Sequence, residues 1–299
     1  MSFSSEVKRE LVGLPLERSC CRAALSYGML ECGHAFSGAQ ISLQTEHEPV
    51  AVLYSELVAA VCGVEKPPVQ ALARRGGFYI VSVEEEAARR RVLERFGHTA
   101  RDVAVRLNRA NLECESCAAA YLRGAFLACG AVTNPASGYH MEFSVPYYNL
   151  CRDLITLLGE LGLRAKQVCR KGTQVAYFKE SEQIEDCLTL MGAPGASLEL
   201  MNVKIVRDIR NNANRIANCE SANIDKTVAA AAVHMQAVRK IEEHGGLDML
   251  PEELREVARL RYDNPDMSLR ELGEAMEPPL SRSGVNHRLR RIVEFAEKL

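Results

Sequence analysis

The sequence predicts an α+β protein in which a duplicated, pseudo-symmetric α/β region precedes an all-helical C-terminal domain. Two apolar segments with small residues at helical spacing end at Gly33 and Gly130, which lie 97 residues apart. The residues after each glycine repeat one order of helices and strands. Residues 252–299 carry only helical patterns, and the last of these is basic. These observations predict two similar halves and a separate helical domain.

The two apolar segments are expected to be helices that pack against each other. Residues 122–130 are apolar with small residues one turn apart, and residues 25–33 form a weaker copy. Small side chains at this spacing let two helix backbones approach closely. The small residues are Ala120, Gly124 and Ala128 in one segment and Ala24, Gly28 and Cys32 in the other.

Two further landmarks recur at the same offset. Pro49 opens a helical pattern 16 residues after the first closing glycine, and Pro146 does so 16 residues after the second. A strand pattern begins at Phe78, 45 residues after the first glycine, and Val175 lies in a strand pattern 45 residues after the second. Each half is therefore predicted to run helix, strands, helix, strands, helix, which makes a pseudo-symmetric dimer within one chain.

The domain boundaries follow from these patterns. Asp225 is expected to cap a separate alanine-rich helix that runs to His244. The predicted segments are 1–110 for the first half, 111–195 for the second half, 196–222 for a linker helix and 223–299 for the C-terminal domain.

The composition is that of an ordinary soluble globular protein, with 47% apolar and 25% charged residues among 299. The N-terminal residues are charged where a signal peptide needs an apolar run. No stretch reaches the roughly 18 apolar residues of a membrane span. We expect a cytoplasmic protein that does not bind membranes. Because the net charge is −2, any binding to nucleic acid must use local basic patches.

The eleven cysteines fall largely in apolar helical patterns, so reduced, buried thiols are expected in place of a disulfide framework. Cys114 and Cys117 form a CxxC pair. Without a second pair at metal-binding spacing, we do not interpret it as a zinc site. The sequence contains neither a GxGxxG motif nor a P-loop. It therefore predicts no bound metal and no cofactor.

The predicted linker helix carries a polar stripe beside its apolar face. Between Lys204 and Asn218 there are four cations and one anion, Asp208. Two interpretations are equally open: a solvated or domain-facing stripe, and contacts with DNA phosphates. The candidates for such additional DNA contacts are Lys204, Arg207, Asn211 and, outside this helix, Lys171.

The C-terminal domain has the pattern of a helix-turn-helix DNA reader. Ser268 and Glu271 form a capping box at the start of a short helix. Ser281 is expected to cap a longer helix with apolar residues at helical spacing. A short helix, a tight turn and a longer basic helix are typical of this motif. The alternative is a solvated helical bundle.

Positive charge is concentrated in the last helix. Residues 252–299 contain nine Lys or Arg and ten Asp or Glu, yet residues 280–291 contain four arginines and no acid. Because attraction to phosphates dominates DNA affinity, this favours a helix that enters a groove. Ser283, His287 and Arg290 occupy the face opposite the apolar stripe. The expected DNA-binding residues are Ser281, Arg282, Ser283, Gly284, Asn286, His287, Arg288, Arg290 and Arg291.

The two small-residue helices resemble the paired motifs of LAGLIDADG homing endonucleases, the second closely and the first loosely. That resemblance implies a saddle-shaped pair of sheets that binds DNA, with an acid at the eighth motif position of each copy that holds the catalytic divalent metal. Those positions are Cys32 and Cys129 here, and thiols are poor ligands for Mg²⁺. Glu31 is one residue away, which turns it about 100° from the axis. We therefore expect no catalytic residues and no nuclease activity.

A LAGLIDADG-like region without its acids, joined to a helix-turn-helix, resembles the WhiA family of bacterial regulators. The matching stretches are MSFSSEVK (1–8), RK (170–171), KESE (179–182), NCESAN (218–223), KTV (226–228), LPEEL (250–254) and SGVNHRLRR (283–291). The resemblance implies a sequence-specific transcription regulator with roles in sporulation, cell division and chromosome segregation. It also implies association with the nucleoid.

Three functional hypotheses remain open at this point. The first is a transcription factor that binds double-stranded DNA, with another regulator or RNA polymerase as a partner. The second is a metal-dependent DNA endonuclease that uses unrecognised acids. The third is that the saddle binds a ligand or a second regulator. The operator sequence does not follow from any of these patterns.

Overall fold

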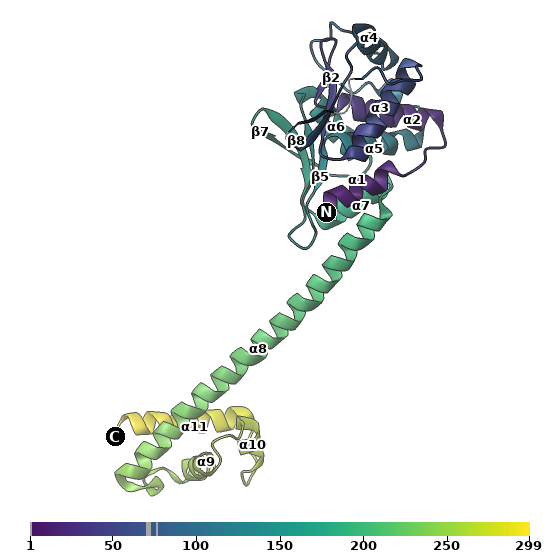
Figure 1. Ribbon diagram of the computed structural model, residues 1–299. Coiled ribbons are helices and arrows are strands. Elements are labelled where there is room, and N and C mark those ends of the chain that lie inside the picture. The colour runs from purple at the N-terminus through teal and green to yellow at the C-terminus, as the bar shows by residue number, and fades with distance from the viewer. Residues whose placement is uncertain (1, 70–72, 76) are drawn as a thin grey trace. The chain divides into compact units, whose positions relative to one another are not determined.

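The computed structural model describes residues 2–69, 73–75 and 77–299. They form two compact units, Met1–Arg207 and Asp208–Leu299, and each has its own hydrophobic core. Within the described ranges, all strands lie in the first unit and the second unit is helical (Figure 1). The predicted α+β class is confirmed.

The first unit contains two copies of one arrangement. In the first copy the elements are α1 (Phe3–Val12), α2 (Ser19–Glu31), β1 (Ala35–Phe36), β2 (Ile41–Thr45), α3 (Glu48–Cys62), β3 (Ala73–Arg75), β4 (Phe78–Ser82) and α4 (Glu86–Arg95). In the second copy they are α5 (Glu115–Cys129), β5 (Gly130–Val132), β6 (Met141–Val145), α6 (Tyr148–Glu160), β7 (Lys166–Arg170), β8 (Thr173–Phe178) and α7 (Ser181–Met191). The antiparallel sheets have matching orders, β1-β2-β4-β3 and β5-β6-β8-β7. The predicted duplication is confirmed.

Local sequence explains these elements. Helix α3 has Pro49 in its first turn and ends at Gly63, which adopts the left-handed conformation with φ 67°. Strand β6 alternates buried and half-buried residues, so Glu142 and Ser144 lie on the open face of its sheet. Strands β1, β3, β5 and β7 were not predicted, because they are short or have no alternation of apolar residues.

Helices α2 and α5 lie against each other at the centre of the first unit. A Cβ atom added to Gly124 would lie 2.1 Å from the backbone oxygen of Leu25, and one added to Gly28 would lie 2.2 Å from that of Tyr121. Both distances are far below van der Waals contact, so the backbones touch only because these residues have no side chain. The predicted interface between the two small-residue helices is present.

One carboxyl group is buried in this interface. Glu31, which is fully buried, accepts hydrogen bonds from the Tyr27 hydroxyl at 2.9 Å and from the Tyr121 hydroxyl of the other copy at 3.0 Å. Burial raises the pKa of Glu31 to about 8. The expectation that Glu31 turns away from the axis is therefore wrong: its longer side chain reaches across to α5.

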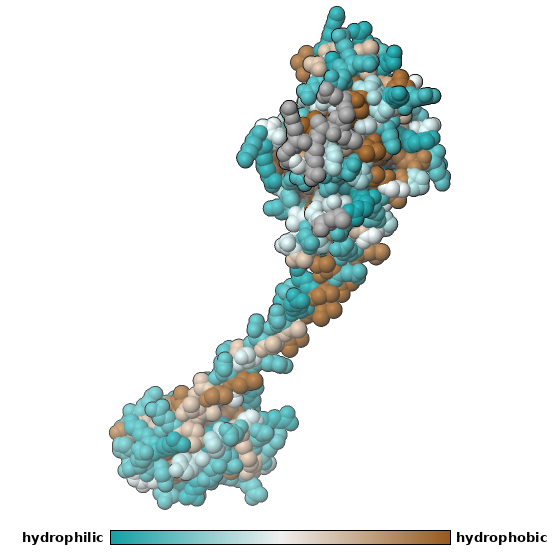
Figure 2. Space-filling view, in the orientation of Figure 1, coloured by the Kyte–Doolittle hydropathy of each residue, from teal (hydrophilic) through white to brown (hydrophobic). Residues whose placement is uncertain are grey.

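Helix α8 (Pro194–Gly245) begins in the first unit and ends in the second. The predicted helix start at Asp225 is wrong, because the residues before it contain no glycine or proline to end the helix. The predicted boundaries at 195/196 and 222/223 accordingly lie at the start of α8 and inside it. Several large hydrophobic side chains of α8 are exposed, as its brown surface in Figure 2 illustrates. They include Leu198, Ile205, Ile209, Ile216, Ile224 and Val228.

The second unit packs three helices against the end of α8. These are α9 (Glu252–Asp263), α10 (Leu269–Glu274) and α11 (Arg282–Glu297). The capping box of Ser268 and Glu271 is present at the start of α10. The turn from α10 to α11 covers residues 275–281 and is longer than the tight turn we predicted, because the Pro278–Pro279 pair delays the next helix.

We predict that Gly124→Ala destabilises the first unit, because the new methyl group forces α2 and α5 apart. Overpacking of this kind costs about 1–3 kcal/mol. The matched control is Gly159→Ala in α6, where an added Cβ meets nothing within 4 Å and the helix gains roughly 0.5–1 kcal/mol. Urea unfolding can follow tyrosine fluorescence, since eight of the nine tyrosines lie in residues 1–207 and there is no tryptophan. Equal effects of the two substitutions would contradict this packing.

We also predict that Glu31→Gln changes how stability depends on pH. The pKa of the Glu31 carboxyl is about 4.5 in the unfolded chain and about 8 in the folded protein. At a pH between these two values, Glu31 keeps its proton only in the folded protein. Glu31 therefore makes the protein less stable as pH rises through this window, by at most about 1.4 kcal/mol per pH unit. The glutamine variant should gain stability relative to wild type from pH 5 to pH 8. The exposed Glu56→Gln is the control, and a pH-independent difference for Glu31→Gln would contradict the assignment.

Candidate nucleic-acid interface

Helix α11 has one buried face and one exposed face. The Ser281 hydroxyl accepts a hydrogen bond from the Gly284 amide at 3.2 Å and so caps the helix. The side chains that anchor the helix are buried in the core of the second unit: Val285, Leu289, Ile292 and Ala296. On the opposite side Ser283, His287 and Arg290 are exposed. The outward face predicted from the sequence is therefore exposed as expected.

A close backbone contact holds α11 to the preceding helix. A Cβ atom on Gly273 of α10 would lie 2.2 Å from the Leu280 backbone oxygen, and the Leu280 amide donates to the Gly273 carbonyl at 2.9 Å. At the far end, the Lys240 ammonium donates to the Ala296 carbonyl at 2.9 Å and satisfies the helix C-terminus. The orientation of α11 within the second unit is thus fixed at both ends.

The other predicted DNA-binding residues of this segment differ in their surroundings. Arg291 is paired with Glu253 of α9, which reduces the charge available to a phosphate. Arg282 is exposed at the start of α11, whereas Asn286, Arg288 and Gly284 are half-buried. Among the nine candidates, Arg282, Ser283, His287 and Arg290 are therefore the accessible ones, and Ser281 is engaged as a cap.

A basic cavity of about 380 Å³ lies between α8, α9, α10 and α11. Its lining includes Lys226, Arg261, Arg270 and Arg282. Arg261 is buried, donates to the Pro265 and Met267 carbonyls at 3.0 and 2.8 Å, and has no partner for its Nε. Sequence reasoning missed this cavity, because its cations come from four different helices and are far apart in the chain.

The candidates for additional DNA contacts have different surroundings. Lys204 is paired with Glu182 and lies 3.8 Å from Glu185. The Arg207 guanidinium donates to the carbonyls of residues 135 and 136 and lies 4.9 Å from the centre of the Tyr139 ring. Both side chains therefore stabilise the first unit. Asn211 is exposed on α8.

Lys171 lies exposed at the tip of the β7–β8 hairpin. Residues 163–179 contain five Lys or Arg and no acid, and they comprise the edge strand β7 of the second sheet and its neighbour β8. One of these cations, Arg170, is paired at 3.0 Å with Glu142 on the open sheet face. The Lys179 ammonium lies 5.9 Å from the centre of the Tyr177 ring. The hairpin is thus the basic edge of the sheet pair.

Cys32 and Cys129, where the resemblance to LAGLIDADG endonucleases led us to expect the catalytic acids, lie at the ends of α2 and α5. Cys32 and Cys129 both line a cavity of about 270 Å³. A hydrogen bond with Cys129, together with burial, raises the pKa of Cys32. The residues that line this cavity in the described part of the chain include no Asp or Glu. A hard divalent cation finds no carboxylate there.

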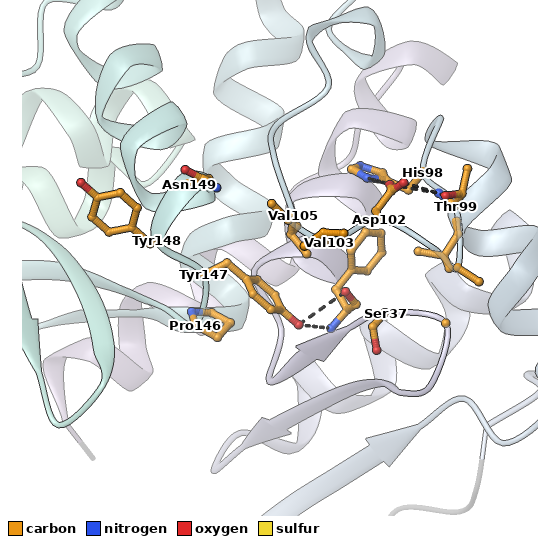
Figure 3. A pocket seen from close by; sticks show the side chains of 15 residues that line it. Ser37, His98, Thr99, Asp102, Val103, Val105, Pro146, Tyr147, Tyr148 and Asn149 are labelled. Carbon is orange, nitrogen blue, oxygen red and sulfur yellow. Dashed lines mark hydrogen bonds and ion pairs between the residues drawn. The ribbon is translucent and has the colours of Figure 1, made fainter.

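A second cavity, of about 360 Å³, lies between the two copies of the first unit. The Tyr147 side chain of the second copy, labelled in Figure 3, lines this cavity. Its hydroxyl accepts a hydrogen bond from the Phe36 amide of β1 at 2.8 Å. At the other end His98 lies beside Asp102, with Nδ1 to Oδ2 at 3.4 Å. Burial lowers the pKa of His98, and its Nε2 lies 2.9 Å from the Tyr27 hydroxyl. The contact of His98 with Tyr27 ties the segment that joins the two copies, residues 96–114, to α2.

Within the described residues, no helix combines the length and the hydrophobicity that a bilayer crossing requires. Helix α8 is long but carries charges along its length.

Comparison with known proteins agrees with this architecture. The chain is 39% identical to a probable cell division protein WhiA of Clostridium perfringens, over all of this chain and 98% of that protein. It is 37% identical to a protein of the same name from Clostridium botulinum, over all of this chain and 99% of that one. The fold also matches the crystal structure of full-length DUF199/WhiA from Thermatoga maritima, with 24% identity, a TM-score of 0.59 and coverage of 100% and 99%.

Two family models match separate parts of the chain. Residues 118–210 match the WhiA LAGLIDADG-like domain, and residues 213–296 match the WhiA C-terminal HTH domain. The first match begins inside α5 and ends inside α8. The chain therefore belongs to the WhiA family.

Proposed function

We propose that this protein is a sequence-specific regulator of transcription that binds double-stranded DNA through α11. The observation that carries the proposal is the division of that helix into an anchored face and an exposed face with Ser283, His287 and Arg290. Arginine binds guanine with two hydrogen bonds, and serine can donate to or accept from either kind of base pair. A rigidly held helix can present these groups to the major groove.

The basic cavity beside α11 supports phosphate binding. Arg282 lines it from the first turn of α11, and Arg270, which is paired with Glu274 at 2.9 Å, lines it from α10. Lys226 adds a third cation from α8. Phosphate contacts of this kind set the register of a helix in the groove, whereas base contacts supply the sequence preference.

The first unit is proposed to be a DNA- or protein-binding saddle without catalytic activity. The basic β7–β8 hairpin with Lys171 supports additional DNA contacts. The thiols at the metal positions support loss of nuclease chemistry, because Mg²⁺ requires oxygen ligands. Another regulator or RNA polymerase is the proposed protein partner.

The cellular role is proposed from the relatives. Those from Clostridium are named as probable cell division proteins, and we propose a role in cell division for this chain too. The family resemblance extends the proposal to sporulation and chromosome segregation. The proposed location is the nucleoid in the cytoplasm.

Two arginine substitutions test the proposed reading helix. Arg290→Ala should reduce affinity for the specific site by roughly 1–3 kcal/mol and affect random DNA less, because it removes a base contact. Arg282→Ala should weaken binding to all sequences and lower the salt slope by about one unit. Salt titrations on a genomic site selected by the full-length protein, and on random DNA, measure both effects.

Arg259→Ala is the matched control, since it removes the same charge from α9, where Arg259 lies 3.6 Å from Asp248. It should leave both titrations close to wild type. If Arg290→Ala weakens specific and random DNA equally, α11 acts as an electrostatic anchor and does not read the sequence.

The loss of nuclease activity has its own test. The double substitution Cys32→Asp with Cys129→Asp should not produce cleavage of supercoiled DNA in Mg²⁺, because two acids alone do not supply the groups that position and activate water. The Cys32→Ser, Cys129→Ser double variant controls for disturbance of the buried site. Metal-dependent nicking by the wild type would refute the non-catalytic proposal. Nicking by the aspartate variant alone would show that the rest of the site is intact.

A further inference from the structure

Four cysteines meet where the two central helices begin. Cys20 and Cys21 lie in the first turn of α2, Cys114 directly precedes α5, and Cys117 lies in the first turn of α5. All four sulfur atoms are within 4.8 Å of one another. The expectation that the CxxC pair has no partner pair is therefore wrong: the second pair is supplied by the other copy of the repeat.

Three of the six sulfur–sulfur distances are close to those in a tetrahedron around one ion. The Cys114 Sγ lies 3.7 Å from that of Cys20, 3.6 Å from that of Cys21 and 3.4 Å from that of Cys117. A zinc ion with four sulfur ligands at about 2.3 Å places neighbouring sulfurs about 3.8 Å apart. In an iron–sulfur cluster, several iron and sulfide ions separate the cysteines, which therefore stand farther apart than here.

The surroundings favour thiolates. The positive charge of Arg18 interacts with the Cys114 sulfur, and both sulfur pairs sit at helix N-termini, where the helix dipole stabilises negative charge.

We propose that Cys20, Cys21, Cys114 and Cys117 bind one Zn²⁺ ion in a structural site. Four thiolates complete a tetrahedral coordination and leave no open position for a substrate. Soft thiolate ligands select zinc over magnesium or calcium. Because each half of the duplicated domain supplies two ligands, the ion joins the starts of α2 and α5. It lies at the opposite end of these helices from Cys32 and Cys129.

Metal analysis of the full-length, untagged protein, purified without chelator, tests the proposal. Inductively coupled plasma mass spectrometry should find about one zinc per chain and no stoichiometric iron. Incubation with a strong chelator should remove the zinc and lower the melting temperature of the first unit, and added Zn²⁺ should restore it. These measurements on the wild type do not depend on whether a cysteine variant folds.

Variants then assign the ligands. Cys20→Ser and Cys117→Ser remove one ligand from each copy. Replacement of a residue that only orients a metal ligand weakens binding about 10–100-fold, so loss of a ligand itself should weaken zinc binding by more than this. The exposed cysteines supply matched controls, Cys169→Ser and Cys219→Ser, which should bind zinc as the wild type does. Replacement of zinc by Co²⁺ should give the intense thiolate absorption of a four-sulfur site.

Several results would overturn the proposal. One is a wild type that binds no zinc even after loading with all its thiols reduced. Others are iron in place of zinc, or a Cys114–Cys117 disulfide in protein taken directly from the cell, detected as the loss of two hydrogens by mass spectrometry. Full zinc retention in Cys20→Ser and Cys117→Ser would place the metal elsewhere.

Discussion

The close approach of α2 and α5 is the constraint on which the first unit depends. Two glycines bring backbone atoms of one helix against the other, and everything else in the domain is arranged around that contact. The sheets follow directly from the ends of these helices, so the line along which the helices meet also relates the two sheets. Four cysteines collect at one end of the pair, and Cys32 and Cys129 lie at the other. One steric requirement therefore positions both groups.

The fold was predictable because it depends on periodic and repeated signals. The offset of 97 residues identified the duplication, and proline, glycine and capping residues marked most helix ends. The continuous helix α8 was missed because Asp225 can serve as a cap but does not have to. An N-cap residue starts a helix only where the preceding residues leave the helical conformation, and here nothing forces them to do so. The edge strands β1, β3 and β5 were missed because they have only two or three residues, and β7 was missed because its five residues show no alternation of apolar residues.

The candidate site was predictable only where its residues share one helix. The exposed face of α11 follows from a period of 3.6 residues, so Ser283, His287 and Arg290 could be grouped from the sequence. The basic cavity combines cations from four helices, and the cysteine cluster joins residues 94 positions apart. Such contacts depend on tertiary packing that no local pattern encodes. Ion pairing also reduces the charge that a basic side chain can offer to DNA. Lys204 and Arg291 have acidic partners that lie elsewhere in the chain, so this effect could not be read from the residues around them.

The two central helices are not equivalent at Glu31. The second copy supplies the Tyr121 hydroxyl that donates to the Glu31 carboxyl at 3.0 Å. At the helix crossing Gly28 faces Tyr121 as Gly124 faces Leu25, so the first copy has Leu25, which carries no hydroxyl, where the second has Tyr121. Two first copies that met through α2 would bury two Glu31 carboxyl groups without this donor, which disfavours their association. The covalent linkage of the two halves instead keeps a first half and a second half together at high local concentration.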